Sequence, residues 1–219
     1  MTEPLSLFSL PLFPLGTVLY PGGTLPLRIF EVRYLDMVRK CHRSGAPFGV
    51  VLLTRGSEVT KASADAATAP GSASETFCPV GTLATITQCE APQPGLLVVR
   101  CTGTRRFRIT RSEKLKHGLW IGDVTLQPTD QAVPIPDDLA HVSQALNALI
   151  QSLHQRAVPV PEMPVQAPYL LDDCAWVANR WCELLPIPVE HKQRLMELDN
   201  PLVRLELVSD VLEGAGISG

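Results

Sequence analysis

The sequence holds few side chains at spacings that support catalysis. It has no GxxxxGK[ST] loop for nucleotide phosphates, no GxSxG nucleophile turn, no HExxH zinc pair and no GxGxxG dinucleotide motif. Cys41 and His42 are adjacent, and neighbouring positions on a helix do not face each other. We therefore expect no catalytic residues, no metal site and no cofactor.

Paired carboxylates and scattered histidines have structural interpretations. Asp137-Asp138 and Asp172-Asp173 each precede a predicted helix, where negative charge stabilises the helix N-terminus. No zinc-ligand spacing recurs among the remaining histidines, which we expect at the surface: His117, His141, His154 and His191. The six cysteines form no CxxC pair, which predicts reduced structural thiols.

The most unusual feature is charge placed within apolar sequence. Arg28, Glu31 and Arg33 interrupt the segment LPLRIFEVRYLDM, and four arginines follow at Arg105, Arg106, Arg108 and Arg111. In one interpretation, Glu31 pairs with an arginine and holds a helix against a sheet. In the other, the arginines form a recognition face, because a guanidinium group binds carboxylates and peptide groups well.

The elements that carry these residues fall into two halves. Residues 5–127 are rich in short apolar and β-branched runs: 5–10, 17–20, 25–29, 48–53, 80–88, 96–102, 105–111 and 119–126. Gly103-Thr104 predicts a two-residue hairpin turn between two of these strands. Such a set of short strands favours a twisted sheet that closes toward a barrel.

One helix is predicted within the β-rich half. Apolar residues recur at helical spacing from Phe30 to Cys41, basic residues follow, and Gly45 offers a stop. Residues 55–76 are mostly Ala, Ser, Thr and Gly, which predicts a mobile loop.

Residues 137–213 are predicted to be helical. An amphipathic stripe covers 139–153, a second helix ends before Pro186, a third runs over 188–198, and Asn200-Pro201 starts a fourth. We therefore expect an α+β fold: a β-rich domain over 1–130, with one interrupting helix, followed by a C-terminal helical bundle over 131–219.

Composition narrows the function classes. The 219 residues include 19 Lys plus Arg and 22 Asp plus Glu, giving a net charge of −3. This balance argues against a nucleic-acid binder, and only 5% of residues are aromatic. No apolar run reaches the roughly 20 residues that span a membrane, and the N-terminus does not resemble a secretory signal. We expect a cytoplasmic protein with no membrane partner.

In these segments the sequence resembles the N-terminal domain of Lon, the ATP-dependent protease. LPLFPLGTVLYPGGTLPLRIFEVRYLDMV (10–38), FGVVLL (48–53), VGTLATI (80–86) and the segment 103–109 match its opening and strand motifs in order. ELLPIPVEHKQRLMELDNPLVRLELVSDVL (183–212) is similar to its helical part. Val32 stands where the family often has proline, and the 55–76 loop is longer and less charged than usual.

The resemblance implies a PUA-like β pseudo-barrel followed by a helical bundle. In the full protease this region helps to recognise substrates, while other parts supply the ATPase and a Ser–Lys proteolytic dyad. We expect this chain to hold neither of those parts and to be a stand-alone, non-catalytic recognition module. Its expected ligands are unfolded or apolar protein segments, which it would deliver to a protease as an adaptor.

The predicted binding groove lies near the strand-to-helix junction. Its candidate residues are Leu25, Arg28, Glu31, Arg33, Tyr34, Arg106 and Phe107. Two alternatives remain open: an RNA-binding protein that presents the arginines at 105–111, and a peptidase with a site that the motifs do not reveal.

Overall fold

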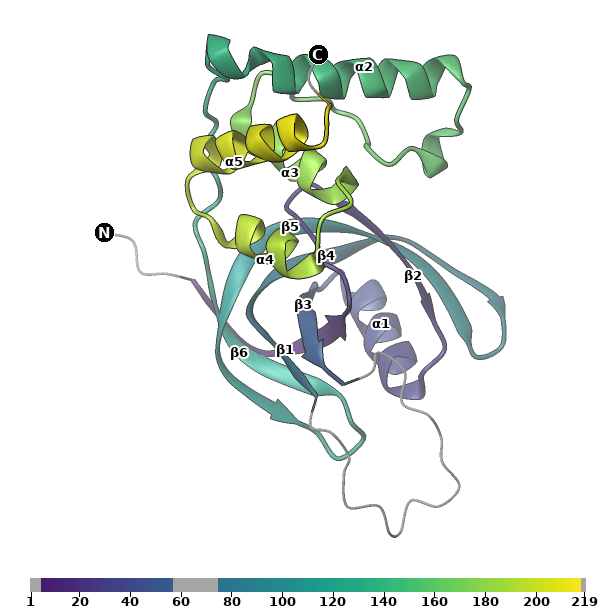
Figure 1. Cartoon of the computed structure of the whole chain (residues 1–219). Helices are drawn as coiled ribbons and strands as arrows, with labels where there is room; N and C mark the ends of the chain where they lie inside the picture. Colours follow the sequence, from purple (N-terminus) through teal and green to yellow (C-terminus); the bar gives the residue numbers. More distant parts are fainter. Residues whose placement is uncertain (1–4, 57–74, 218–219) are drawn as a thin grey trace. The chain divides into compact units, whose positions relative to one another are not determined.

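The computed structural model describes residues 5–56 and 75–217, and the chain divides into two compact units. Unit 1 comprises Met1–Pro21 and Leu25–Pro128, and unit 2 comprises Gly22–Thr24 and Thr129–Gly219. Unit 1 contains the sheet and one helix, whereas the other helices belong to unit 2 (Figure 1). The expected α+β fold is confirmed.

The strands of unit 1 curl into a ring. They are β1 (Ser6–Leu15), β2 (Thr24–Ile29), β3 (Phe48–Arg55), β4 (Thr76–Gln93), β5 (Leu96–Lys114) and β6 (Trp120–Leu126). Their order is β2-β5-β4-β3-β1-β6, and a further pairing of β5 with β6 closes the ring. β1 and β3 are parallel, and the chain between them forms β2 and the helix α1 (Val32–Ser44).

The length of β5 makes this closure possible. Its residues 96–108 pair with β4, and its residues 107–114 pair with β6. Since β4 occupies one edge of β5 along its first half, β2 takes the opposite edge there. β2 is thus the last strand of the sheet, with one edge unpaired among the described residues.

The ring of Phe107 fills the centre of the barrel. Its side chain is fully buried among apolar residues from four other strands: Leu10, Leu12, Val51, Leu83, Val124 and Leu126. A Cβ atom at Gly49 would lie 2.7 Å from the Phe107 ring, and one at Gly81 would lie 2.8 Å from it. The two glycines therefore leave the space that the ring occupies.

Helix α1 packs on the sheet through a second apolar cluster. The helix contributes five side chains, Tyr34, Leu35, Met37, Val38 and Cys41. Tyr34 stacks on Phe13 with ring centroids 3.9 Å apart. Gly45 ends the helix in the left-handed conformation at φ 67°, as its position in the sequence predicts.

The predicted hairpin turn at Gly103-Thr104 is wrong, because β5 runs without interruption through both residues. The turn between β4 and β5 lies at Pro94-Gly95 instead. A Cβ atom at Gly103 would lie 2.2 Å from the carbonyl oxygen of Tyr20, so this glycine permits a close approach of backbones rather than a turn.

Two further predictions for unit 1 concern residues 17–20 and the loop over 55–76. Residues 17–20, predicted as a strand, form an irregular segment, to which Thr82 is anchored by a 2.6 Å hydrogen bond from its hydroxyl group to Leu19 O. The loop predicted over 55–76 falls mainly on residues 57–74, which lie outside the described residues.

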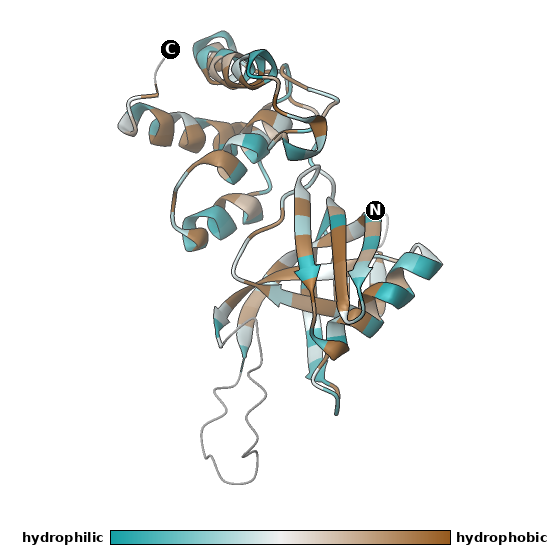
Figure 2. Ribbon diagram, turned by 90° about the vertical axis from the view of Figure 1, so that its right-hand side faces the viewer, coloured by the Kyte–Doolittle hydropathy of each residue, from teal (hydrophilic) through white to brown (hydrophobic). Residues whose placement is uncertain are grey.

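The helices of unit 2 match the predicted pattern. They are α2 (Ala140–Gln155), α3 (Cys174–Leu184), α4 (Val189–Glu197) and α5 (Pro201–Gly214), with short 3₁₀ turns at Asp137–Leu139 and Val160–Glu162. Apolar and polar residues alternate along them (Figure 2). The side chain of Asp173 accepts a hydrogen bond from Trp176 N and that of Asn200 from Leu202 N, so both residues cap helices as predicted. No helix of the described residues is both long and apolar enough to span a membrane.

A buried arginine that the sequence analysis did not identify joins three segments of unit 2. The Arg204 side chain is 1% exposed, and its Nη1 lies 2.7 Å from Asp130 Oδ2 and 2.9 Å from Asn179 Oδ1. Its Nε donates to Leu195 O at 3.0 Å, and Nη2 donates to Leu198 O. The guanidinium group therefore satisfies two backbone carbonyls at the end of α4 and one carboxylate.

The substitution G103A should destabilise unit 1, because the new methyl group collides with a backbone carbonyl that cannot rotate away. We expect a loss of on the order of 1–3 kcal/mol in the free energy of unfolding, measured by urea denaturation. Q88A, at an exposed position of β4, is the control and should change stability by less than about 0.5 kcal/mol. Equal stability of the two variants would contradict the close approach.

The substitution R204M should cost about 3–5 kcal/mol of unfolding free energy, because it removes the guanidinium group that pairs with the partly buried Asp130 carboxylate. R194M removes the same charge from an exposed position of α4 and should stay within about 0.5 kcal/mol of the parent. The two variants are compared by denaturation followed by tryptophan fluorescence. A cost for R204M as small as that for R194M would refute the proposed role of Arg204.

Candidate functional site

A cleft of about 200 Å³ lies between β2 and the start of α1. Its floor is apolar and consists of four buried side chains, those of Phe13, Leu15, Ile29 and Tyr34. Its remaining lining residues are Pro26, Leu27, Arg28, Phe30 and Glu31. The cleft thus brings together three of the predicted site residues, Arg28, Glu31 and Tyr34.

Two exposed apolar side chains stand at this strand-to-helix junction. Phe30 is 55% exposed and Val32 is 73% exposed. Large apolar groups in such positions lose contact with water only when a partner covers them. Sequence periodicity assigned Phe30 to the buried face of the helix. Val32 was noted only because the family often has proline at its position.

A second hollow, of about 410 Å³, lies on the other side of Val32. It is lined by Pro11, Val32, Arg33, Asp36, Met37, Lys40, Cys41, His117 and Leu119. Burial raises the pKa of the Cys41 thiol, which disfavours the thiolate. Cys41 is therefore a core side chain at the base of this hollow rather than an activated nucleophile.

Arg33 fixes the first turn of α1 to the barrel. Its Nε lies 3.1 Å from Glu31 Oε2, its Nη1 donates to Gly118 O at 2.8 Å, and its Nη2 lies 3.6 Å from Glu75 Oε1. The Arg33 side chain is 8% exposed and lies over the Tyr34 ring, with 4.6 Å between Cζ and the ring centroid. Glu31 pairs with an arginine, Arg33, as expected. Because these two residues are neighbours in sequence, the helix is linked to the barrel through the contacts of Arg33 with Gly118 and Glu75.

Glu75, the residue just before β4, completes this network. Its Oε2 accepts hydrogen bonds from Lys114 Nζ at 2.9 Å and from Trp120 Nε1 at 2.7 Å. Burial alone would raise the pKa of Glu75, but these two hydrogen bonds and the charges of Lys114 and Arg33 lower it below its ordinary value. The carboxylate therefore stays ionised and remains a partner for Arg33.

The structure does not bring the other predicted site residues to the cleft. Phe107 is the fully buried centre of the barrel, and Arg106 is 4% exposed. Leu25 is partly buried against the cluster beneath α1. Arg105 donates from Nη2 to Gln127 O at 3.0 Å, while Arg108 and Arg111 are exposed on β5. These arginines form no surface shared with the cleft.

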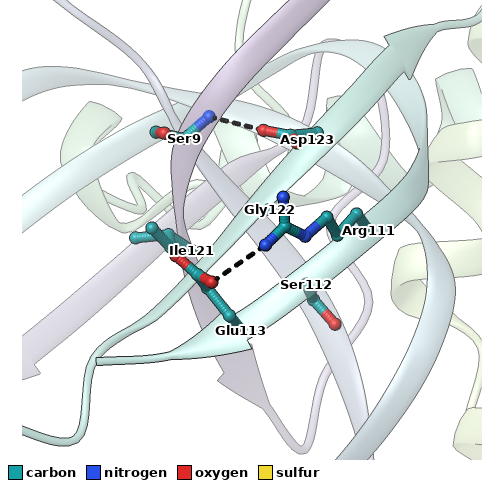
Figure 3. Close-up of a pocket in the computed structure, with 7 residues that line it drawn as sticks. All are labelled: Ser9, Arg111, Ser112, Glu113, Ile121, Gly122 and Asp123. Carbon is teal, nitrogen blue, oxygen red and sulfur yellow. Dashed lines mark hydrogen bonds and ion pairs between the residues drawn. The ribbon is translucent and has the colours of Figure 1, made fainter. Parts of the chain in front are cut away.

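A third, smaller hollow lies where β1 carries a bulge at Ser9, whose φ is 53° (Figure 3). Its volume is about 70 Å³. Ser9 N donates to Asp123 Oδ1 at 3.0 Å, and Arg111 Nη2 lies 3.4 Å from Glu113 Oε2, so its polar groups pair with one another. This hollow is accordingly a weaker candidate than the cleft.

The described residues contain no group of three or more His, Cys, Asp or Glu side chains that could hold a metal ion. All six cysteines are free thiols in the structure.

Comparison with known proteins gives a consistent match. The chain is 33% identical to the crystal structure of a Lon N-terminal domain protein from Xanthomonas campestris, covering 93% of this chain and 98% of that one, with a TM-score of 0.70. The N-terminal domain of Mycobacterium avium complex Lon protease shares the fold at 18% identity, with a TM-score of 0.54 and coverage of 92% and 96%.

A full-length relative shows how much of a Lon protease this match represents. Lon protease of Anaeromyxobacter dehalogenans (strain 2CP-C) is 24% identical over 208 residues, which are 93% of this chain and 23% of the relative. The model of the ATP-dependent protease La (LON) substrate-binding domain matches residues 9–214. This chain therefore belongs to the family of Lon substrate-binding domains.

Proposed function

We propose that this protein is a recognition module that binds unfolded or apolar polypeptide segments at the cleft between β2 and α1. The fold of a Lon substrate-binding domain supports a role in substrate recognition. The observation that carries the finer proposal is the exposure of Phe30 and Val32 beside a cleft with an apolar floor. A segment that covers both side chains removes them from water.

The expected affinity of such a site is modest. Complete burial of a Val or Phe side chain contributes roughly 1.5–3 kcal/mol, and these two are already partly covered. Together they supply about 2–4 kcal/mol, which corresponds to a dissociation constant on the order of 10⁻³ to 10⁻² M for a single contact. Weak contacts of low sequence specificity suit capture of many different unfolded chains.

The charges around the cleft divide into two roles. Glu31 and Arg33 pair with each other, and we assign them to holding the cleft in shape. Arg28 is exposed, lines the cleft, and forms no ion pair within the part of the chain that the structure describes. We assign to Arg28 the attraction of acidic groups in a bound segment.

We propose no peptidase activity for the matched residues 9–214, because the family that they match is a substrate-binding domain. An adaptor role, in which the captured segment passes to a protease, follows from this as part of the proposal. RNA binding has weaker support, since Arg106 is buried and Arg105 bonds to the backbone.

The double variant F30S/V32S tests the site. It should weaken binding of fluorescein-labelled, reduced and carboxymethylated lactalbumin at least tenfold, measured by fluorescence anisotropy, because it removes the apolar groups that the client covers. Since both side chains are exposed, the free energy of unfolding should change by less than about 1 kcal/mol.

The matched control is F8S/V160S, which replaces the same residue types at positions 77% and 68% exposed. This control should bind the unfolded protein like the parent. Equal loss of binding in both double variants would show that general surface hydrophobicity is responsible, and unchanged binding in F30S/V32S would rule out the cleft.

A further inference from the structure

We propose that the captured segment binds as an additional β-strand, hydrogen-bonded to the unpaired edge of β2. This inference rests on the proposed function and adds the conformation of the bound chain and the groups that hold it. It commits to one occupant, an extended polypeptide segment with apolar side chains at alternate positions.

The edge of β2 offers unpaired backbone groups. β2 has β5 as its only neighbour in the sheet of the described residues. Beyond that pairing, the described residues supply no backbone hydrogen-bond partner for positions 25–30. A row of alternating N–H and C=O groups is complementary to the backbone of another extended chain, and this is how strand addition is recognised.

The sequence of β2 indicates which groups face outward. Backbone groups of alternate residues point to the same edge of a strand. Pro26 has no N–H to donate, and proline in a strand is placed with its nitrogen away from the ladder. Arg28 shares this direction, so its N–H and C=O, together with the C=O of Pro26, are the groups offered to a ligand.

The cleft beside this edge accommodates one set of side chains. An added strand directs alternate side chains to one face, where the floor of Phe13, Leu15, Ile29 and Tyr34 lies. The volume of about 200 Å³ is below the roughly 300–1,000 Å³ of small-molecule sites. It suits single apolar side chains of a peptide, and the neighbouring Phe30 extends that contact surface.

Main-chain pairing also explains how a site with low side-chain specificity gains useful affinity. Hydrogen bonds to the backbone are independent of the client's sequence, while the apolar floor selects segments with alternating apolar residues. β2 is only six residues long and carries Pro26 and Arg28, features that limit irreversible edge-to-edge association. Such an edge favours short, reversible pairing with an unfolded client.

The test uses a fluorescein-labelled, acetylated and amidated 12-residue peptide of alternating Leu or Val and Ser or Thr residues. Two derivatives are N-methylated at three central backbone amides, one at the apolar and the other at the polar positions. Methylation keeps the side chains but removes donors. The alternation fixes which face meets the cleft, so for a peptide that adds in one direction along β2 only one of the two sets faces β2.

We expect one methylated peptide to bind at least tenfold more weakly than the parent peptide, and the other to bind within about twofold of it, in anisotropy titrations with the intact protein. Binding of both within twofold would overturn strand addition while leaving capture of unfolded protein intact. Failure of the parent peptide to bind, with unfolded lactalbumin still bound, would also overturn it.

Two further outcomes distinguish a failure of strand addition from a failure of the proposed function. If neither the peptide nor unfolded lactalbumin binds, the proposed function itself fails. If light scattering shows a dimer that the peptide dissociates, the edge of β2 pairs with a second copy of the chain, and the inference of a client strand is wrong.

Discussion

The arrangement of unit 1 depends on the space that two glycines leave for one aromatic ring. Phe107 can lie at the barrel centre only because Gly49 and Gly81 carry no Cβ atoms. The ring lies on the part of β5 that pairs with both β4 and β6, so the same residue marks the closure of the barrel. Because the barrel closes through β5, both edges of that strand are paired, and β2 is the last strand of the sheet. The candidate site is therefore a consequence of how the core is filled.

The Arg33 network determines how the site is presented to solvent. Glu31, Gly118 and Glu75 hold the guanidinium group from three different segments. This places the first turn of α1 against the barrel, so Phe30 and Val32 stay exposed on a fixed backbone. A fixed apolar surface loses less conformational entropy on binding than a mobile loop. We therefore assign Glu31 and Arg33 to positioning these apolar groups and leave Arg28 as the charge available to a ligand.

Sequence patterns predicted the helices and strands that are determined by residues close together in the sequence. The helices followed from apolar periodicity and from end signals such as Asn200 and Gly45. Each of the six strands overlaps a predicted apolar or β-branched run, although β5 was predicted as two strands, 96–102 and 105–111. The failure at Gly103 has a non-local cause, because the Tyr20 carbonyl that requires a glycine is distant in sequence. The role of Arg204 was missed for the same reason: its partners come from segments that no spacing rule connects.

The site was predicted only in part. Arg28 and Glu31 were identified because charge within apolar sequence is unusual, and Tyr34 because it lies near the strand-to-helix junction. The structure places all three at the cleft. Phe107 and Arg106 attracted attention through strand alternation, which does not show that a closed barrel buries both side chains. The exposure of Phe30 and Val32 was not predicted, because the sequence alone does not distinguish an exposed apolar residue from a buried one.

The most direct test of this account is amide hydrogen exchange of the intact protein, followed by mass spectrometry, with and without saturating unfolded lactalbumin. The account predicts slower exchange confined to peptides that cover residues 26–34. Protection elsewhere in the described chain, with exchange unchanged across 26–34, would contradict a binding site at the cleft between β2 and α1.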